Sequence, residues 1–454
     1  MTRFFLVVAL TLTVVACGGG STGNSNADTG VDPGALNAGP GNNNPTGTGT
    51  NTGSNDNTNF NASSGNTGPI AATNIADLLV DSGPDGRGVN RLYTNVTICK
   101  PGSTTLCKTI DHVLVDTGSV GLRLLASEVP ADLQLSAAKN TNGNVLLGCA
   151  NFLDGSFAWG PLALADVKLG GLTASNTAVQ LVGHSDYDPF QYQCSSGGDP
   201  IITAGDLGAN GILGVGLSKQ DCGSVCEQQG RRSARNGKYF SCINVACTNA
   251  TGATLASDKQ LQQVVARFPT DNNGFAIQMN SVPSAGAATA TGKMIFGLGT
   301  RTNNQFPRAQ VLATSSQGYL YGTLSSDTQL LGGSFPSSFL DTGSNGIFFD
   351  AYLPNCTYPN DPGFYCPLVD IAFNVALGRI GAAQVRATFT LSNAASLFQK
   401  GNAALPTLGG ALSAPGLLDL GLPFFYGKTV VIGIDGSSAT GVGTGTATGP
   451  FYAL

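Results

Sequence analysis

Short runs of alternating apolar and polar residues dominate the chain after about residue 88. Examples are RLYTNVTI at 91–98, GFAIQMN at 274–280, KMIFGLG at 293–299 and KTVVIGID at 428–435, and clusters of Gly, Pro and Asn separate such runs. A two-residue period places alternate side chains on opposite faces of a strand, and the intervening residues favour turns. The pattern therefore predicts many short strands.

Helical periodicity is rare in the same region. LRLLASEVP at 122–130 is long enough for one or two turns, and DKQLQQVVARF at 258–268 has apolar residues at helical spacing, which makes it the best helix candidate. The composition agrees with a β-rich body, since 63 of the 454 residues are Gly and only 11% are charged. We expect an all-β fold of barrels or packed sheets with few short helices.

Two of the predicted strands run into the same four residues. HVLVDTGSVGLRLL at 112–125 and SSFLDTGSNGIFF at 337–349 both pass from apolar residues into Asp-Thr-Gly-Ser and then return to apolar residues. In each turn the Thr hydroxyl can hold the loop, the Gly lets backbone amides approach the carboxylate, and the Ser hydroxyl can donate to it. Two such turns placed face to face would bring the carboxylates of Asp116 and Asp341 into contact.

Two carboxylates in contact cannot both be ionised, so they share one proton and titrate together. One of them is then a base while the other is an acid. A water between them can be deprotonated while a substrate carbonyl is protonated, which hydrolyses an amide bond without a metal, a cofactor or a covalent intermediate.

A third similar stretch, LLVDSGPDG around Asp81, must be weighed as well. Only 35 residues separate Asp81 from Asp116, too few to form a lobe, and Pro84 interrupts the strand that would follow. Because Asp, Ser, Gly and Pro all favour turns, we interpret this stretch as an ordinary turn.

The two Asp-Thr-Gly-Ser turns and three further segments resemble the pepsin-like aspartic peptidases, in the family's order along the chain. The further segments are ANGILGVGLS at 209–218, GKMIFGLGT at 292–300 and DLGLPFFYGKTVVIGID at 419–435. The resemblance implies a bilobal all-β fold, one catalytic aspartate from each lobe, and a long cleft that binds an extended peptide. It assigns catalysis to Asp116 and Asp341 and supporting roles to Thr117, Gly118, Ser119, Thr342, Gly343 and Ser344.

The chain departs from the family pattern around the expected cleft. Members usually cover the cleft with a hairpin that carries a tyrosine, whereas residues 152–171 contain none, so Phe152 or Trp159 is expected to contact the substrate instead. Trp159 could equally be a packing residue. Arg123 stands where the family often has Trp, and it could contact substrate or pair with Glu128.

The N-terminus has the features of an export signal. MTRFFLVVALTLTVVAC carries one positive charge before an apolar run too short to span a membrane comfortably, and VVAC resembles the box at which bacterial lipoproteins are cleaved and lipidated, here on Cys17. The alternative is an ordinary signal peptide with a chance cysteine. Residues 18–69 are nearly all Gly, Asn, Ser, Thr and Asp, which predicts a disordered tether.

From these features we expect a signal peptide at 1–17, the tether at 18–69, an N-terminal lobe with a Cys-rich insertion at 70–273, and a C-terminal lobe at 274–454. The folded part would be a monomer, exported and anchored to the bacterial cell envelope through the lipid on Cys17, at the outer membrane and facing the periplasm or the surface. The signal, tether and cysteines also resemble a group of uncharacterised bacterial lipoproteins. The net charge of -5 argues against a nucleic-acid partner.

Ten cysteines remain after Cys17, an even number in an exported chain, which predicts disulfides. Two neighbouring pairs, 99 with 107 and 356 with 366, are close enough for local bridges. The alternative is a zinc site at 222, 226, 242 and 247, although these spacings depart from the usual two-residue knuckles. The candidates are Cys99, Cys107, Cys149, Cys194, Cys222, Cys226, Cys242, Cys247, Cys356 and Cys366.

The sequence therefore favours a membrane-tethered aspartic endopeptidase that cleaves extended, apolar segments of a peptide or protein substrate, with no cofactor and no metal. The alternative is a catalytically inactive protein of the same fold that binds peptides or a protein partner in its cleft. A Ser-His-Asp hydrolase would need a catalytic histidine, and neither His112 nor His184 lies beside a nucleophile motif. Residues 18–86 contain no Lys or Arg, so inhibition by a basic pro-segment is not expected.

Overall fold

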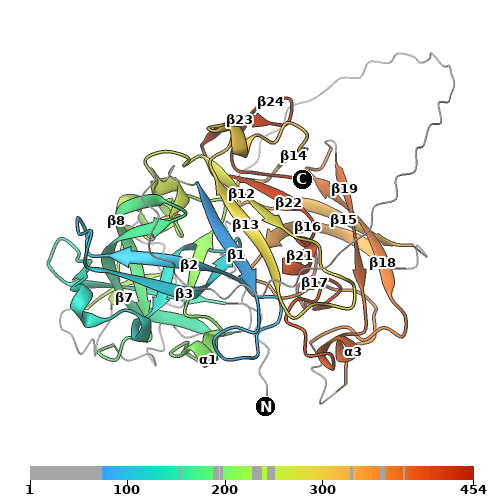
Figure 1. Cartoon of the computed structure of the whole chain (residues 1–454), viewed down its shortest axis with the longest axis horizontal. Helices are drawn as coiled ribbons and strands as arrows, with labels where there is room; N and C mark the ends of the chain where they lie inside the picture. The colour runs from blue at the N-terminus through green and yellow to red at the C-terminus, as the bar shows by residue number, and fades with distance from the viewer. Residues whose placement is uncertain are drawn as a thin grey trace, which may run out of the picture. The chain divides into compact units, whose positions relative to one another are not determined.

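The computed structural model describes residues 74–152, 155–187, 194, 198–227, 238–242, 251–327, 331–357, 363–381 and 384–454. The predicted signal peptide, Cys17 and the tether lie outside these residues. Regular structure in the described part is nearly all β-strand (Figure 1), which confirms the all-β fold class. No helix in these ranges combines the length and apolar character that crossing a membrane requires.

The strands are short and numerous, as the alternating pattern predicted. In chain order they are β1 (Ile75–Val80), β2 (Leu92–Cys99), β3 (Cys107–Asp116), β4 (Val120–Leu125), β5 (Ser136–Ala137), β6 (Val145–Asn151), β7 (Phe157–Leu169), β8 (Leu172–Val182), β9 (Gly211–Val215), β10 (Tyr239–Cys242), β11 (Thr251–Gly252), β12 (Gly274–Met279), β13 (Ala290–Phe296), β14 (Val311–Ala313), β15 (Leu320–Ser326), β16 (Gly332–Asp341), β17 (Ile347–Phe349), β18 (Ile371–Gly378), β19 (Val385–Leu391), β20 (Gly409–Ala411), β21 (Leu417–Gly421), β22 (Thr429–Gly433), β23 (Ser438–Val442), β24 (Gly445–Thr448) and β25 (Phe451–Ala453).

The described helices are all brief. The α-helices are α1 (Ala204–Leu207), α2 (Ser224–Glu227) and α3 (Ala394–Phe398). The 3-10 turns are η1 (Ala126–Glu128), η2 (Ala131–Leu133), η3 (Ser257–Lys259), η4 (Val265–Arg267), η5 (Thr302–Asn304) and η6 (Leu422–Phe424).

Six strands of the N-terminal half close into a barrel. They pair in the order β7-β8-β4-β9-β3-β2, and pairing of β2 with β7 completes the ring. Alternate residues of β2 and β3, among them Val96, Ile98, Val113 and Val115, belong to one buried apolar cluster. The apolar residues that alternate in the sequence therefore line the interior of this barrel.

The C-terminal half repeats the central part of this arrangement. In the barrel β3 pairs in parallel with β9, and β9 pairs antiparallel with β4. Likewise β16 pairs in parallel with β21, and β21 pairs antiparallel with β17. A seven-stranded sheet in the order β19-β18-β15-β16-β21-β17-β20 is built around the second set. The two Asp-Thr-Gly-Ser turns thus follow two equivalent strands, β3 and β16.

Strands from both halves join in one sheet. β1 pairs with β13, β13 with β12 and β12 with β22, and these strands lie side by side in Figure 1. β1 also pairs with β2 of the barrel. The first described strand therefore connects the barrel to strands of the second half of the chain.

The prediction of a helix at 258–268 is wrong. The segment forms only the two separate 3-10 turns η3 and η4. The Gln260 side-chain amide donates to the carbonyl groups of Gly223 and Leu255, and the backbone N–H of Gln263 donates to the Lys219 carbonyl at 2.9 Å. Because these bonds tie the segment to the chain around α2, they replace the i to i−4 bonds of a helix.

Candidate active site

Asp116 and Asp341 are the last residues of β3 and β16. Asp116 pairs with Gly214 of β9, and Asp341 pairs with Gly421 of β21. A Cβ on Gly214 would lie 2.8 Å from the Ser119 hydroxyl oxygen, so only glycine lets the turn fold back against the strand. Each aspartate is thereby held at the end of a strand that is paired on both sides.

Each turn binds its carboxylate through the same pair of donors. The Gly118 backbone N–H donates to Oδ1 of Asp116 at 2.8 Å, and the Ser119 hydroxyl donates to Oδ2. In the second turn the corresponding bonds to Asp341 come from the Gly343 N–H at 2.8 Å and the Ser344 hydroxyl at 2.9 Å. The structure thus brings the small residues of both motifs into the contacts that their chemistry suggested.

The two threonines bind each turn to the opposite strand. The Thr117 hydroxyl donates to the Leu340 carbonyl at 2.8 Å, and the Thr342 hydroxyl donates to the Val115 carbonyl at 2.6 Å. Each hydroxyl oxygen also accepts the backbone N–H of the other threonine, at 3.0 and 3.2 Å. These four buried bonds fix the two turns relative to one another.

The carboxyl groups of Asp116 and Asp341 face one another between the two turns, since a Cβ on Gly343 would lie 2.7 Å from Oδ1 of Asp116 and 3.1 Å from Oδ1 of Asp341. Both residues have 0% exposure. A Cβ on Gly118 would lie 2.8 Å from Oδ1 of Asp341, so the two glycines leave the space in which the groups meet. Two carboxyl groups this close and this buried do not both ionise, so the pair holds a proton, which makes one group an acid and the other a base.

Burial is the largest cause that raises the pKa of both carboxyl groups above the ordinary value. For Asp116 the hydrogen bonds from Ser119 and Asp341 oppose this rise. For Asp341 the nearby charges of Asp116 and Asp419 add to burial, and the pKa lies well above the ordinary value. The shared proton therefore persists to a higher pH than it would on an isolated aspartate.

A third buried carboxyl group, that of Asp419 in β21, extends the pair. The Ser344 hydroxyl lies 2.9 Å from Oδ2 of Asp341 and 2.6 Å from Oδ2 of Asp419. A hydroxyl has one hydrogen, so one of these contacts must be donated by a protonated carboxyl group. Burial raises the pKa of Asp419 well above the ordinary value, and its Oδ1 is buried without a hydrogen-bond partner. Both features fit a neutral Asp419.

Asp419 has no role in the two Asp-Thr-Gly-Ser motifs, yet the sequence carries a signal for it. Asp419 and Ile212 occupy equivalent places in β21 and β9, two residues before Gly421 and Gly214. The first half of the chain has an apolar residue at this buried position, as strand patterning requires. At the equivalent position the second half has Asp419, and this difference from Ile212 is visible when the two segments are aligned.

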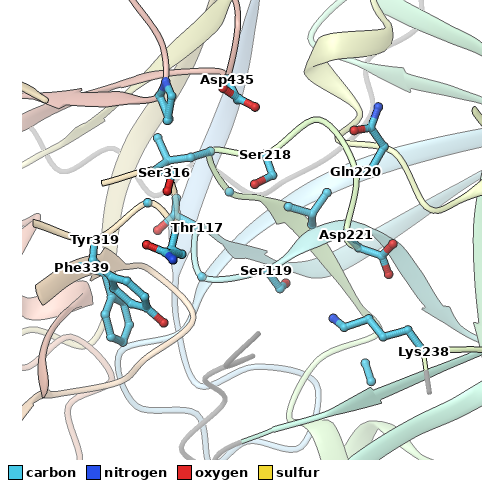
Figure 2. Close-up of a pocket in the computed structure, with 18 of the residues that line it drawn as sticks. Thr117, Ser119, Ser218, Gln220, Asp221, Lys238, Ser316, Tyr319, Phe339 and Asp435 are labelled. Carbon is cyan, nitrogen blue, oxygen red and sulfur yellow. The ribbon is translucent and has the colours of Figure 1, made fainter. Parts of the chain in front are cut away.

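A cavity of about 120 Å³ opens beside the first turn (Figure 2). Thr117 and Ser119 of that turn border it. Tyr319 and Phe339 border it on the left in Figure 2, and their rings pack edge to face with centroids 6.2 Å apart. The cavity therefore adjoins the turn that follows Asp116 and combines polar and aromatic surfaces.

Two of the residues expected to contact substrate are instead core residues. Trp159, which is 1% exposed, lies in β7 with its ring edge-on to Phe240 at 5.2 Å. Phe152 is 5% exposed and packs in a buried cluster with Tyr93 and Ile201. The expectation that Phe152 or Trp159 contacts the substrate is corrected accordingly, because packing between strands buries both rings.

Arg123 borders the cavity but does not pair with Glu128. Its guanidinium lies 3.4 Å from Oδ2 of Asp221, and both side chains are 4% exposed. A second nitrogen donates to the Val120 carbonyl at 2.9 Å. The alternative pairing with Glu128 was therefore wrong, since the partner comes from a loop far along the chain rather than from η1.

The cysteines form disulfides wherever the structure describes a pair. The bridges are Cys99–Cys107, Cys149–Cys194, Cys222–Cys226 and Cys356–Cys366, which confirms both predicted local pairs. Cys242 is also disulfide-bonded, whereas Cys247 lies outside the described residues. The alternative zinc site loses two of its four sulfurs to the 222–226 bridge. Within the described ranges, no group of three or more His, Cys, Asp or Glu side chains could hold a metal ion.

Comparison with known proteins gives one family match. Residues 70–454 match the family described as "Protein of unknown function (DUF3443)". No curated protein matches the chain. Among solved structures, the aspartic proteinase from Irpex lacteus is similar, with 17% sequence identity and a TM-score of 0.41 over 84% of this chain and 96% of that one.

Proposed function

The chain belongs to the family of proteins of unknown function DUF3443, and we propose that it is an aspartic endopeptidase whose catalytic pair is Asp116 and Asp341. The observation that carries the proposal is the close approach of these two fully buried carboxyl groups, both of which lie beside Gly343. A protein gains no stability from placing two acids in contact in its interior, since burial and like charge both oppose ionisation. A constellation of this kind is typical of a site that moves protons.

The reaction would use the two protonation states at the same time. The ionised carboxylate removes a proton from a water bound between the groups, and the water oxygen attacks the carbonyl carbon of the peptide bond. The protonated carboxyl group donates to the carbonyl oxygen. As the resulting diol collapses, one of its hydroxyl groups gives its proton to the ionised carboxylate, the other carboxyl group gives its proton to the nitrogen, and the carbon–nitrogen bond breaks. The pair then again holds one proton.

The donors around the pair support this assignment. Gly118 N–H and Ser119 bind Asp116, and Gly343 N–H and Ser344 bind Asp341. These bonds orient the carboxyl groups before substrate arrives, so no reorganisation is needed during the reaction. The cavity beside the first turn supplies space for a substrate side chain next to Thr117, Gly118 and Ser119.

The experiment is cleavage of an unfolded-protein mixture by the full chain across pH 3 to 8, with fragments identified by mass spectrometry. We expect cleavage by the wild type and a loss of at least about 10³-fold in Asp116→Asn and in Asp341→Asn, because either change removes the acid–base partnership. Asp435→Asn, at the rim of the cavity, is the carboxylate control. Absence of cleavage by correctly disulfide-bonded wild type at every pH would contradict the proposal.

A further inference from the structure

Lys238 directs a charged group into the cavity beside the catalytic pair. It immediately precedes β10, and its backbone carbonyl accepts the Cys149 N–H of β6 at 2.8 Å, which fixes the start of its side chain. The side chain borders the cavity and is partly buried. In Figure 2 it extends from the lower right with its nitrogen toward the open space below Ser119. The ammonium group is therefore available to a molecule in the cavity.

Asp221, a lining carboxylate whose charge acts on Lys238, already has two other partners. Asp221 Oδ2 receives the Arg123 guanidinium at 3.4 Å, and Asp221 Oδ1 accepts the Tyr239 hydroxyl. Tyr239 in turn accepts the Leu261 N–H at 2.7 Å. In the described part of the chain, no carboxylate lies within ion-pair distance of the Lys238 nitrogen. Asp221 thus neutralises Arg123, and Lys238 remains as a surplus positive charge.

A second unsatisfied donor lies in the same wall. Nε of Arg123 is buried and has no hydrogen-bond partner. Burial lowers the pKa of Lys238 and the Arg123 charge adds to this, while the charge of Asp221 opposes it. A desolvated ammonium without a counter-charge is costly, and an anion placed beside it recovers that cost. Asp435 lies at the opposite end of the cavity in Figure 2, exposed, and so leaves this end positive.

We propose that the Lys238 end of the cavity is a subsite for a carboxylate of the substrate, so that the enzyme favours peptides with an acidic residue or a free C-terminus near the bond that is cut. This proposal rests on the proposed function. The ammonium of Lys238 binds the carboxylate, and the Arg123–Asp221–Tyr239 network holds the wall in place. Tyr319 and Phe339 on the facing side pack against the aliphatic part of the same substrate residue.

The size of the cavity agrees with one substrate side chain. Its volume is about 120 Å³. A cavity of about 150 Å³ accommodates a benzene molecule, so this space suits a glutamate side chain rather than a long peptide segment. A neutral isostere such as glutamine fills the same volume but leaves the charge of Lys238 uncompensated. Charge is therefore the property on which the subsite discriminates.

The test compares peptides that differ only in this charge. Extended apolar peptides with amidated C-termini carry a single Glu or Gln at successive positions around the cut bond, and a second arm offers the same peptide with a free or an amidated C-terminus. We expect the full chain to prefer the carboxylate form by about 10-fold or more in kcat/KM, since a charged hydrogen bond strengthens binding by that order. The two arms distinguish a side-chain carboxylate from a terminal one.

Variants of Lys238 assign the preference to this residue. Lys238→Met should reduce the ratio of kcat/KM for the Glu peptide to that for the Gln peptide to within about twofold, because the positive charge is lost. Lys238→Glu should reverse the preference, and Lys238→Arg, which keeps the charge, should retain it. Lys259→Met, at an exposed surface lysine, is the matched control and should leave the ratio unchanged. If Lys238→Arg keeps the preference for the carboxylate peptide, its loss in Lys238→Met is due to the missing charge and not to a failure to fold.

Binding measurements keep this proposal separate from the proposed function. Fluorescently labelled Glu and Gln peptides are titrated into the Asp116→Asn variant, which needs no turnover. If the wild type cleaves peptides without a carboxylate preference in either arm, the proposed subsite is contradicted and the proposed peptidase function is not. Preferential binding of the carboxylate peptide that is lost in Asp116→Asn/Lys238→Met supports the subsite even if the wild type cleaves nothing. Equal binding of both peptides overturns it in that case as well.

Discussion

At the scale of single residues, three buried acids determine the chemistry. Asp116, Asp341 and Asp419 all have 0% exposure. Hydrogen bonds to Ser344 connect Asp341 with Asp419, and Asp116 faces Asp341 beside Gly343. Burial raises the pKa of each, so the folded chain holds protons there that the unfolded chain releases. Function at this site is therefore linked to a cost in stability that depends on pH.

The first prediction concerns that cost. A raised folded-state pKa means that the folded chain binds more protons than the unfolded one above the ordinary Asp pKa, so stability falls as pH rises from about 4 toward 7. The asparagine in Asp341→Asn cannot ionise, so the free energy of unfolding of this variant should fall less over this interval. At pH 7 it should exceed that of the wild type by on the order of 1–2 kcal/mol. Chemical unfolding at several pH values measures this. Exposed Asp258→Asn is the control, and an unchanged pH slope in Asp341→Asn would contradict the interpretation.

The second prediction concerns Asp419 as a positioning residue. If it is a neutral donor to Ser344, Asp419→Asn supplies an amide N–H in its place and should retain most activity. Asp419→Leu removes the donor and should lower kcat about 10-fold. It should also shift the alkaline limb of the pH–rate profile to lower pH, because Asp341 loses the charge on Asp419 that helps to raise its pKa. The groups that face this network are Asp116, Asp341 and Tyr452. An Asn variant as impaired as the Leu variant would indicate that Asp419 acts in ionised form.

At the scale of elements, the two halves of the site are joined by their turns. β3 and β16 end in equivalent positions, and the threonine hydroxyls bind each turn to the backbone of the other strand. Because each carboxylate is fixed within its own turn, the distance between carboxylates depends on this link between turns. Small displacements of one strand would separate the acid from the base.

The third prediction tests the link. Thr117→Val keeps the shape but removes the hydroxyl, which leaves the Leu340 carbonyl and the Thr342 N–H unsatisfied in the interior. We expect a loss of about 1–3 kcal/mol in the free energy of unfolding, together with a lower kcat. Thr97→Val is the matched control, because the Thr97–Thr109 hydroxyl pair at 2.7 Å is exposed and water can replace it. Equal losses in both variants would show that the buried link has no special weight.

At the scale of the whole molecule, one strand connects parts that are distant in sequence. β1 pairs with β2 of the barrel and with β13 of the second half. Leu78 in β1 is 2% exposed and belongs to the large apolar cluster that includes residues of both halves. Unfolding of either half therefore exposes apolar surface of the other, which favours a single cooperative transition.

The fourth prediction follows from this connection. Leu78→Ala should lower stability by about 2–5 kcal/mol through the cavity it leaves. The sequence has one tryptophan, so fluorescence of Trp159 reports the barrel while circular dichroism reports all strands. We expect both signals to shift together. Exposed Leu106→Ala should change stability by less than about 0.5 kcal/mol, and a shift of one signal alone in Leu78→Ala would show that the halves unfold separately.

The sequence alone determined the features that depend on local pattern. Alternation of apolar and polar residues identified the strands, the repeated Asp-Thr-Gly-Ser identified both turns, and close cysteine spacing identified the bridges 99–107 and 356–366. These features are encoded within a few residues of one another. Backbone preference and side-chain alternation therefore express them without knowledge of the rest of the chain.

Only the tertiary structure decided the features that depend on what meets across the fold. The apolar spacing of 258–268 resembled a helix, but glutamine bonds to distant backbone hold the segment otherwise. Trp159 is a core residue, Arg123 pairs with Asp221 rather than Glu128, and Ser344 links Asp419 to Asp341. Burial and partnership between residues far apart in the chain set these outcomes. Such burial and such contacts cannot be predicted from neighbours in sequence, because they exist only once the strands are paired.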